Sequence, residues 1–316
     1  MYKQLSREQR YAIYLGLQEG KSYTAIALQI KCSVSTVSRE VRRNTNRHGH
    51  YIFEEAVELT KVRRERSTAN RRTPAHVLKE AMDLLVSEDW SPKQISGALR
   101  LKGVHISHER IYQEIRADQT GELRKHCRHK LKYRHHTAPK RKTAGKSLIP
   151  NRVPIQDRPP EADGTRFGDW EMDLVVGKGQ KSAVLTIIER STNMFFQTKL
   201  PSKKPTVVAK AVYRILLPYK SHVKTITTDN GTEFMEHEWI AKKLATTVYF
   251  ADPFCSGQKG AVENANKLLR QYFPKGTDFR EVKQADLDAV QAKINRRPRE
   301  KLNFDTPVRV FFKSID

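Results

Sequence analysis

The second half of the chain alternates short runs of β-branched and aromatic residues with turn residues, and this pattern restricts its fold more than any other feature. Three such runs, 169–177 (DWEMDLVVG), 182–190 (SAVLTIIER) and 194–200 (MFFQTKL), are joined by short turns, which predicts an antiparallel meander. The segments that follow alternate between helix and strand patterns: helix 205–219, strand 223–228, helix 233–245, strand 247–251 and a helix from about 259. We therefore predict an α/β layer with helices on a mixed five-stranded sheet.

Acidic residues lie inside the first predicted strand, among apolar neighbours. Period-two alternation places Asp169, Glu171 and Asp173 on one face of that strand, so position alone does not choose between them. Asp173 lies deepest among the apolar residues, and burying a carboxylate is costly unless it is paired or bound to a metal. The pattern predicts a cation beside Asp173.

A second carboxylate, Asp229, follows the predicted strand 223–228 and precedes Asn230 and Gly231. Asn-Gly is a strong hairpin signal because both residues tolerate positive φ. On that interpretation Asp229 only bonds the local backbone of a turn. The alternative, a functional carboxylate, depends on partners elsewhere in the chain.

A third carboxylate, Glu263, lies in the predicted helix GAVENANKLLRQYF. One face of this helix is apolar: Val262, Ala265, Leu269 and Tyr272. The other face carries Glu263, Asn266, Lys267 and Arg270. By itself this pattern also fits a solvated polar face. Three carboxylates from separate elements, however, are what two divalent cations need, and such ions support in-line phosphoryl transfer.

The segment 22–44 (SYTAIALQIKCSVSTVSREVRRN) predicts two short helices around a tight turn. Ala27 is the small residue that close packing needs, and Ser33 or Ser35 can cap the second helix. Lys31 stands in the turn where glycine is common, at a cost of about 1 kcal/mol if φ is positive. Small polar residues followed by arginines suit a helix that enters the DNA major groove, although an ordinary helical hairpin is the alternative. The apolar residues expected to join the helices are Ile26, Ile30, Val34 and Val37.

A second, weaker copy follows at 90–115. Ser91 to Gln94 form a capping box with proline at the first helical position, and Ser107 can begin the next helix, with Ile111 and Ile115 inside. This pattern predicts either a second DNA-contacting unit or a plain scaffold. The predicted domains are a helix-turn-helix domain at 1–46, a connecting helix and basic linker at 47–72, a second helix-turn-helix-like domain at 73–118, a basic linker at 119–160 and the α/β domain at 161–316.

Charge predicts the class of partner. The formal net charge is +24, and the first 150 residues carry 31 Lys and Arg against 15 Asp and Glu. A surplus of this size implies a polyanion, contacted most densely by the N-terminal half. Residues 123–156 contain 11 Lys and Arg and no acid, which predicts an extended linker that becomes ordered on a nucleic-acid backbone.

Other classes of protein find less support. The apolar runs are far shorter than the ~18–20 residues that span a bilayer, and the N-terminus lacks the apolar core of a signal peptide. Cys32, Cys127 and Cys255 are odd in number and far apart, which predicts a reducing compartment without disulfides. The four histidines around Cys127 match no usual zinc framework. We expect no membrane association.

Three stretches resemble the DDE transposases of the insertion-sequence-thirty family: WEMDLVVG, TTDNGTEF and VENANKLLRQYFPKGTDF. Thirty-three residues separate Asp229 from Glu263, which is the D-D-33-E spacing of that family. The segments SVSTVSREVRRN and WSPKQISGALR also resemble its two DNA-binding units, and the resemblance covers nearly the whole chain. The departures are Met172 where glycine is common, Lys31 in the turn, and Ala261-Val262 before Glu263.

The resemblance implies an RNase H-like catalytic domain in which Asp173, Asp229 and Glu263 are the catalytic metal ligands, and it selects Asp173 in the first strand. It implies two Mg²⁺ ions per active site, for which Mn²⁺ can substitute. The implied partner is double-stranded DNA, as terminal inverted repeats and as target. Because two DNA ends must be joined, at least a homodimer is expected. A bacterial-type, cytoplasmic and nucleoid-associated location follows.

The implied activity is metal-dependent cleavage at the element's ends, followed by attack of the freed 3′-OH on another phosphodiester. The alternatives are a catalytically silent helix-turn-helix regulator, which the intact acidic triad disfavours, and an RNase H-like nuclease, which the duplicated DNA-binding units disfavour. Asn230 and Asn266 are expected to support the site. The expected DNA contacts are Ser35, Thr36, Arg39, Arg42, Arg43, Lys93, His108, Arg110, Lys267 and Arg270.

Overall fold

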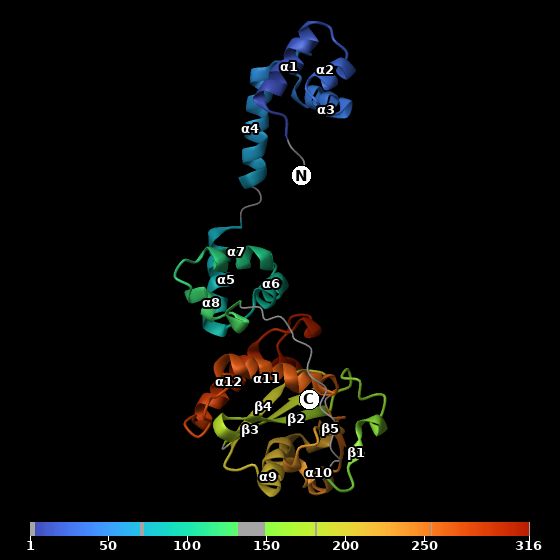
Figure 1. Cartoon of the computed structure of the whole chain (residues 1–316), viewed down its shortest axis with the longest axis vertical. Helices are drawn as coiled ribbons and strands as arrows, with labels where there is room; N and C mark the ends of the chain where they lie inside the picture. The colour runs from blue at the N-terminus through green and yellow to red at the C-terminus, as the bar shows by residue number, and fades with distance from the viewer. Residues whose placement is uncertain (1–3, 70–72, 132–148, 181, 254, 316) are drawn as a thin grey trace. The chain divides into compact units, whose positions relative to one another are not determined.

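The structure is a computed structural model that describes residues 4–69, 73–131, 149–180, 182–253 and 255–315. The chain divides into two compact units, 1–74 and 75–316 (Figure 1), and each is described by itself. Among the described helices, none combines the length and the apolar composition that crossing a bilayer requires.

The first unit consists of helices α1 (Arg7–Gln18), α2 (Tyr23–Gln29), α3 (Val34–Asn44) and α4 (Phe53–Ala69). Serines begin the first three helices, because Ser6, Ser22 and Ser33 each accept a hydrogen bond from a backbone N–H of the first turn. The choice between Ser33 and Ser35 as the cap of α3 is thereby resolved in favour of Ser33. Lys31 has a φ of 53°, so the condition for its conformational cost is met.

The core of this unit confirms most of the predicted apolar set. Ile26, Ile30 and Val37 are buried, and Ala27 lies between them. The prediction for Val34 is wrong, because its exposed fraction is 42%. Val34 is the first residue of α3. The buried residues on the same side of the helix begin one turn later and include Val41.

The second unit begins with a helical module of α5 (Ala75–Glu88), α6 (Pro92–Leu101), α7 (His108–Ala117), α8 (Glu122–Lys125) and η1 (Arg128–Leu131). The predicted capping box is present, since Ser91 accepts from the Gln94 N–H and the Gln94 side chain accepts from the Ser91 N–H. Ser107 caps α7, and Ile111 and Ile115 are fully buried.

The predicted linker at 119–160 is wrong at both of its ends. Leu123, Cys127 and Leu131 pack on the core of the helical module, and Cys127 is buried there. At the other end Ile149 belongs to the core of the α/β domain, which therefore begins before residue 161. The rest of this prediction, 132–148, lies outside the described residues.

The sheet has the strand order β1-β6-β5-β2-β3-β4. The predicted meander is confirmed, because β2 (Asp169–Val176), β3 (Ala183–Glu189) and β4 (Phe195–Leu200) pair antiparallel. β5 (Thr225–Thr228) pairs parallel with β2 and with β6 (Thr247–Phe250). The prediction of five strands missed β1 (Val153–Pro154), which adds to the edge beside β6. Proline is tolerated at such an edge, where its missing N–H breaks no ladder.

Helices cover both faces of the sheet (Figure 1). α9 (Pro205–Leu216), α10 (His237–Leu244) and α13 (Pro307–Lys313) share one apolar core with Trp170 and Met172. α11 (Gly260–Tyr272) and α12 (Gln284–Arg296) share another core with Val175 and Val184. The remaining single turns are 3₁₀ helices: η2 (Ile155–Asp157), η3 (Lys178–Gln180), η4 (Leu217–His222), η5 (Thr232–Phe234), η6 (Ser256–Lys259) and η7 (Glu300–Leu302).

This arrangement places the acids of β2 under α11. Because side chains alternate along a strand, Trp170 and Met172 face the α9 side while Asp169, Glu171 and Asp173 face the α11 side. A row of three carboxylates on a buried face needs partners, and their partners define the candidate site.

Candidate active site

Two of the three acids on β2 are used for structure. Asp169, which is fully buried, accepts two hydrogen bonds from the Arg166 guanidinium, at 2.7 and 3.0 Å, and one from the Thr225 hydroxyl. Glu171 pairs with Arg190 Nε at 2.9 Å. It also accepts from the Val262 N–H, in the first turn of α11, at 2.9 Å. Burial raises the pKa of the Glu171 carboxyl. Asp173 is therefore the acid of β2 that remains available for an active site.

Asp173 and Asp229 converge on one buried cation, Lys259. The Lys259 Nζ lies 3.3 Å from Asp173 Oδ1 and 3.1 Å from Asp229 Oδ2. Its side chain is 8% exposed, whereas that of Asp229 is 45% exposed. The predicted cation beside Asp173 is thus a lysine of the chain itself.

The electrostatics of this trio follow from its burial. Burial raises the pKa of the Asp173 carboxyl; the Lys259 ammonium lowers it and the Asp229 charge raises it, and the net direction is upward. Burial also disfavours the charged form of Lys259, but the two carboxylates outweigh it and raise the pKa of that ammonium. Lys259 stays charged and neutralises part of the acid pair.

Asp229 does not lie in a hairpin. β5 is followed by the 3₁₀ turn η5, and Gly231 has a φ of −68°. A Cβ at Gly231 would lie 2.6 Å from Glu233 Cδ and 3.0 Å from Asp229 Oδ1. Both atoms belong to ends of flexible side chains, and φ is negative, so the hairpin interpretation is wrong. The local bond expected of Asp229 is nevertheless present, because its Oδ1 accepts from the Gly231 N–H at 3.0 Å. Asn230 supports the turn by donating to the Ala251 carbonyl and accepting from Arg152.

α11 contributes Asn266 directly. Its Nδ2 donates to Asp173 Oδ2 at 2.8 Å, while its buried Oδ1 has no hydrogen-bond partner among the described residues. Glu263 lies one turn earlier on the same face of α11, and its carboxylate forms no ion pair or hydrogen bond with the described chain. In the part of the chain that is described, no three His, Cys, Asp or Glu side chains gather as a metal site.

The side chains that do converge fit a divalent cation in chemical type. The carboxylates of Asp173 and Asp229 both contact the Lys259 ammonium. Asn266, which is bonded to Asp173, has a side-chain oxygen without a partner among the described residues. Hard oxygen donors of this kind are the ligands that Mg²⁺ prefers. Sequence reasoning missed Lys259; the signal that could have found it is its position four residues before Glu263, one helical turn away.

The other predicted residues of α11 differ in their surroundings. Arg270 donates to the carbonyls of Val176, Phe273 and Pro274, at 3.0 to 3.4 Å, and so ties the end of α11 to the end of β2. Lys267 is exposed. A DNA contact by either residue stays a prediction, and Arg270 would have to make it in addition to these bonds.

The predicted DNA contacts of the helical units lie mostly at the surface. On α3, Ser35, Arg39, Arg42 and Arg43 are exposed, and Thr36 is partly exposed and bonded to Ser33. In the α5–α8 module, Lys93 pairs with Glu300 at 2.6 Å and Arg110 with Glu114 at 3.0 Å, while His108 is exposed. Their contacts with DNA stay predictions.

Two family models match separate parts of the chain. Residues 1–44 match the helix-turn-helix domain family, and residues 166–255 match the integrase core domain family. The chain is similar to the catalytic core domain of BIV integrase, with 21% identity over 48% of this chain and 97% of that chain and a TM-score of 0.39.

Three curated relatives match almost the whole chain. The transposase for insertion sequence element IS4351 of Bacteroides fragilis is 40% identical over 100% of this chain and 98% of its own length. The transposase for element IS1086 of Cupriavidus metallidurans is 35% identical over 98% of this chain and 94% of its own. Transposase InsI for element IS30A of Escherichia coli is 34% identical over 98% of this chain and 84% of its own. With an integrase core, a helix-turn-helix region and similarity of this extent, the chain belongs to the IS30 family of DDE transposases.

Proposed function

We propose that this protein cleaves DNA at the ends of its own insertion sequence and joins the freed 3′-OH to a phosphodiester of target DNA. The observation that carries the proposal is the convergence of Asp173 and Asp229 on one position of positive charge, with Asn266 bonded to Asp173. The relatives named above are transposases of insertion sequences, which supports the same reaction.

Asp173, Asp229 and Glu263 would hold two Mg²⁺ ions, with Mn²⁺ as a substitute. When bound, such ions activate the attacking oxygen and stabilise the leaving one. Lys259 contacts both aspartates and holds them together, and Asn266 fixes the orientation of Asp173. The buried Glu171 anchors the first turn of α11, and therefore Glu263, above β2.

DNA recognition is assigned to the helical units. Ser35 and Thr36 at the start of α3 suit contacts with base edges, and Arg39, Arg42 and Arg43 suit phosphates on either side. Lys267, exposed on the same helix as Glu263, suits phosphates near the bond that is cut. Two ends have to be joined, so the active form is a homodimer or a larger assembly on DNA.

The test is cleavage of a labelled duplex that carries the element's end, with Mg²⁺ or with EDTA. We expect metal-dependent nicking at the element boundary, its loss in Asp229→Asn and unchanged binding of the duplex by that variant. Asp288→Asn makes the same chemical change at an exposed position of α12 and is the matched control. Nicking that persists in Asp229→Asn would refute the assignment of the site.

A catalytically silent regulator is the alternative that the same assay distinguishes. Tight, salt-sensitive binding of the element's end without nicking in Mg²⁺ or Mn²⁺ would establish this alternative. Cleavage of an RNA–DNA hybrid in preference to the element's end would instead indicate a nuclease.

A further inference from the structure

Three arginines with no acidic partner lie near α11, where the α5–α8 module meets the α/β domain. Arg128 Nη2 donates to Asn264 Oδ1 at 2.9 Å, and Arg299 Nη2 donates to the Ile294 carbonyl at 3.0 Å. Arg297 donates to Gln271 Oε1 at 3.1 Å and to the Tyr272 hydroxyl. All of these acceptors are neutral, and no described Asp or Glu forms an ion pair with any of the three.

The three guanidiniums repel one another. Burial lowers the pKa of Arg299 to about 10, and the charges of Arg297 and Arg128 act in the same direction. The pKa of Arg128 is also lowered, by burial and by Arg297. Of the three, Arg297 is buried, Arg299 is partly exposed and Arg128 is exposed. A buried cation is costly unless an anion compensates it, and no described Asp or Glu does so for Arg297.

One N–H of the cluster is unused. Arg297 is 2% exposed, and its Nε is buried without a hydrogen-bond partner among the described residues. Such a group is expensive to leave unsatisfied, by about 1–3 kcal/mol or more for a charged group. An oxyanion beside the Arg297 guanidinium would compensate the charge that no described acid balances.

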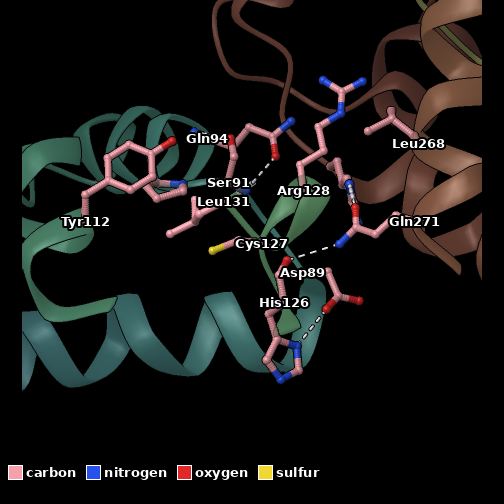
Figure 2. A pocket seen from close by; sticks show the side chains of 12 residues that line it. Asp89, Ser91, Gln94, Tyr112, His126, Cys127, Arg128, Leu131, Leu268 and Gln271 are labelled. Carbon is pink, nitrogen blue, oxygen red and sulfur yellow. Dashed lines mark hydrogen bonds and ion pairs between the residues drawn. The ribbon is translucent and has the colours of Figure 1, made fainter. Parts of the chain in front are cut away.

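A cavity of about 250 Å³ adjoins the cluster, and both Arg128 and Arg297 line it. Figure 2 shows Gln271 and Leu268 of α11 on one side and Ser91, Gln94 and Tyr112 of the α5–α8 module on the other. Arg128, from η1 of the module, reaches across to α11. The one carboxylate in its lining, Asp89, is already bonded: His126 Nδ1 lies 2.7 Å away, the Tyr272 hydroxyl 3.0 Å and Lys293 Nζ 3.2 Å. The charge of Asp89 is therefore already compensated by these partners and not by the three arginines.

We propose that this cavity is a binding site for a phosphate of the DNA backbone, held by Arg128 and Arg297 with Arg299 adding charge. Guanidinium groups are the side chains best suited to phosphate oxygens. Arg124 and Lys125, exposed on α8 just before Arg128, extend positive charge along the chain. The site rests on the proposed function only in taking DNA as the source of the phosphate; free inorganic phosphate shares the same chemistry.

The consequence is a DNA contact on the helix that carries Glu263. Arg128 bonds to Asn264, which is the residue after Glu263, and Arg297 bonds to Gln271 near the end of the same helix. A phosphate bound here is therefore in contact with side chains that rest on α11. DNA that reaches the module also reaches the helix of the active site.

The test uses the full chain with Arg128→Gln, compared with Arg214→Gln as a control. Arg128 and Arg214 are both exposed, and Arg214 lies on α9, which covers the opposite face of the sheet from α11, so the two variants lose the same charge at different places. The first measurement is duplex affinity against salt concentration. Loss of one phosphate contact lowers the slope of log Kd against log salt by about 0.9, and we expect this in Arg128→Gln and not in Arg214→Gln.

The second measurement is thermal unfolding in phosphate and in chloride at equal ionic strength. We expect phosphate to raise the Tm of the wild type and of Arg214→Gln, and not that of Arg128→Gln, because a ligand that binds only the folded chain stabilises it. Arg299→Gln should weaken the phosphate response in the same way. Equal Tm values of all variants in chloride would show that folding is intact.

Three outcomes would overturn the proposal. If Arg128→Gln keeps the salt slope and the phosphate response of the control, there is no site. If Arg128→Gln instead lowers the Tm in chloride without changing either readout, Arg128 only joins the module to α11. If it loses the phosphate response but keeps the salt slope, the site takes a free phosphate ion and not DNA. Neither measurement depends on cleavage, so a wild type that binds DNA without nicking it would refute the proposed function and leave this site standing.

Discussion

Lys259 determines how easily a metal enters the acid pair. Its ammonium occupies the position between Asp173 and Asp229, so a divalent cation must displace a buried charge that both aspartates stabilise. In Lys259→Met we expect Mn²⁺ to bind about tenfold more tightly, which corresponds to about 1.4 kcal/mol. Electron paramagnetic resonance of free Mn²⁺ measures this without DNA or turnover.

Lys267→Met is the matched control, because it removes the same charge from an exposed position of α11. It should leave the Mn²⁺ affinity within about twofold of the wild type. Weaker Mn²⁺ binding in Lys259→Met than in this control would show that Lys259 builds the site rather than competing for it.

Individual residues show where sequence reasoning works and where it stops. The alternation along β2 was enough to place Asp173 on a buried face, because period-two geometry is local. Its partner Lys259 ends η6, 86 residues further along the chain. The spacing of Lys259 from Glu263 suggests that it belongs to the site, but alternation along β2 does not identify its contact with Asp173. The Asn-Gly pair wrongly predicts a hairpin, because Gly231 has a φ of −68° and is followed by the 3₁₀ turn η5.

At the scale of elements, Asp89 joins the α5–α8 module to α11 and α12. It follows the end of α5 with a φ of 54° and bonds to His126, Tyr272 and Lys293. Burial disfavours its charge, but these three hydrogen bonds outweigh burial and lower the pKa of Asp89 below its ordinary value of 3.8.

We expect Asp89→Asn to lower the free energy of unfolding by about 1.5–3 kcal/mol at neutral pH, as for lost hydrogen bonds to a charged group. Because the pKa is lower in the folded chain, this stabilisation is present above pH 3.8 and is lost as the pH falls through the folded pKa. Denaturant unfolding at several pH values measures it. A difference between wild type and variant that stays constant down to the lowest pH would contradict the role of the carboxylate charge.

Gly97 makes a second junction of the α5–α8 module, with the segment that follows η7. A Cβ at this position in α6 would lie 2.1 Å from the ring of Phe304, over which Arg100 is also stacked. We expect Gly97→Ala to destabilise the second unit by about 1–3 kcal/mol through overpacking.

Gly260→Ala is the control for Gly97→Ala, since nothing lies within 4 Å of its Cβ position at the start of α11. There the same change should be neutral or stabilising, because alanine favours the helix. Chemical denaturation of both variants gives the comparison, and equal stabilities would mean that Phe304 moves aside freely.

Sequence reasoning found the capped helices more reliably than the connections between them. Ser91 and Gln94 mark the start of α6 in the sequence, because the hydrogen bonds of the capping box form within a segment of four residues. The segment after Asp118 was interpreted as a linker because its charge is high, and yet Leu123, Cys127 and Leu131 recur every fourth residue and pack on the module. The high charge of this segment hides its row of apolar residues, which their regular spacing of four predicts.

At the scale of the whole molecule, the two units 1–74 and 75–316 each have their own apolar core. We therefore expect a fragment of residues 75–316 to fold without the first unit and to bind Mn²⁺ as the full chain does. Calorimetry of the full chain should show the transitions of the two fragments added together, since domains with separate cores unfold separately. A single transition shared by both parts would contradict the division.

The side chains near the two ends of α11 must point in fixed directions as well as lie a fixed distance apart. Over its 13 residues, about 20 Å, its first turns bond to Glu171 and Asp173 and its last to His126 and Asp89. One residue inserted in the middle would rotate the second set by about 100° relative to the first. Either the acid end or the module end would then lose its register. The chain accordingly cannot gain or lose a residue between Asn266 and Gln271 without breaking one of the two sets of contacts.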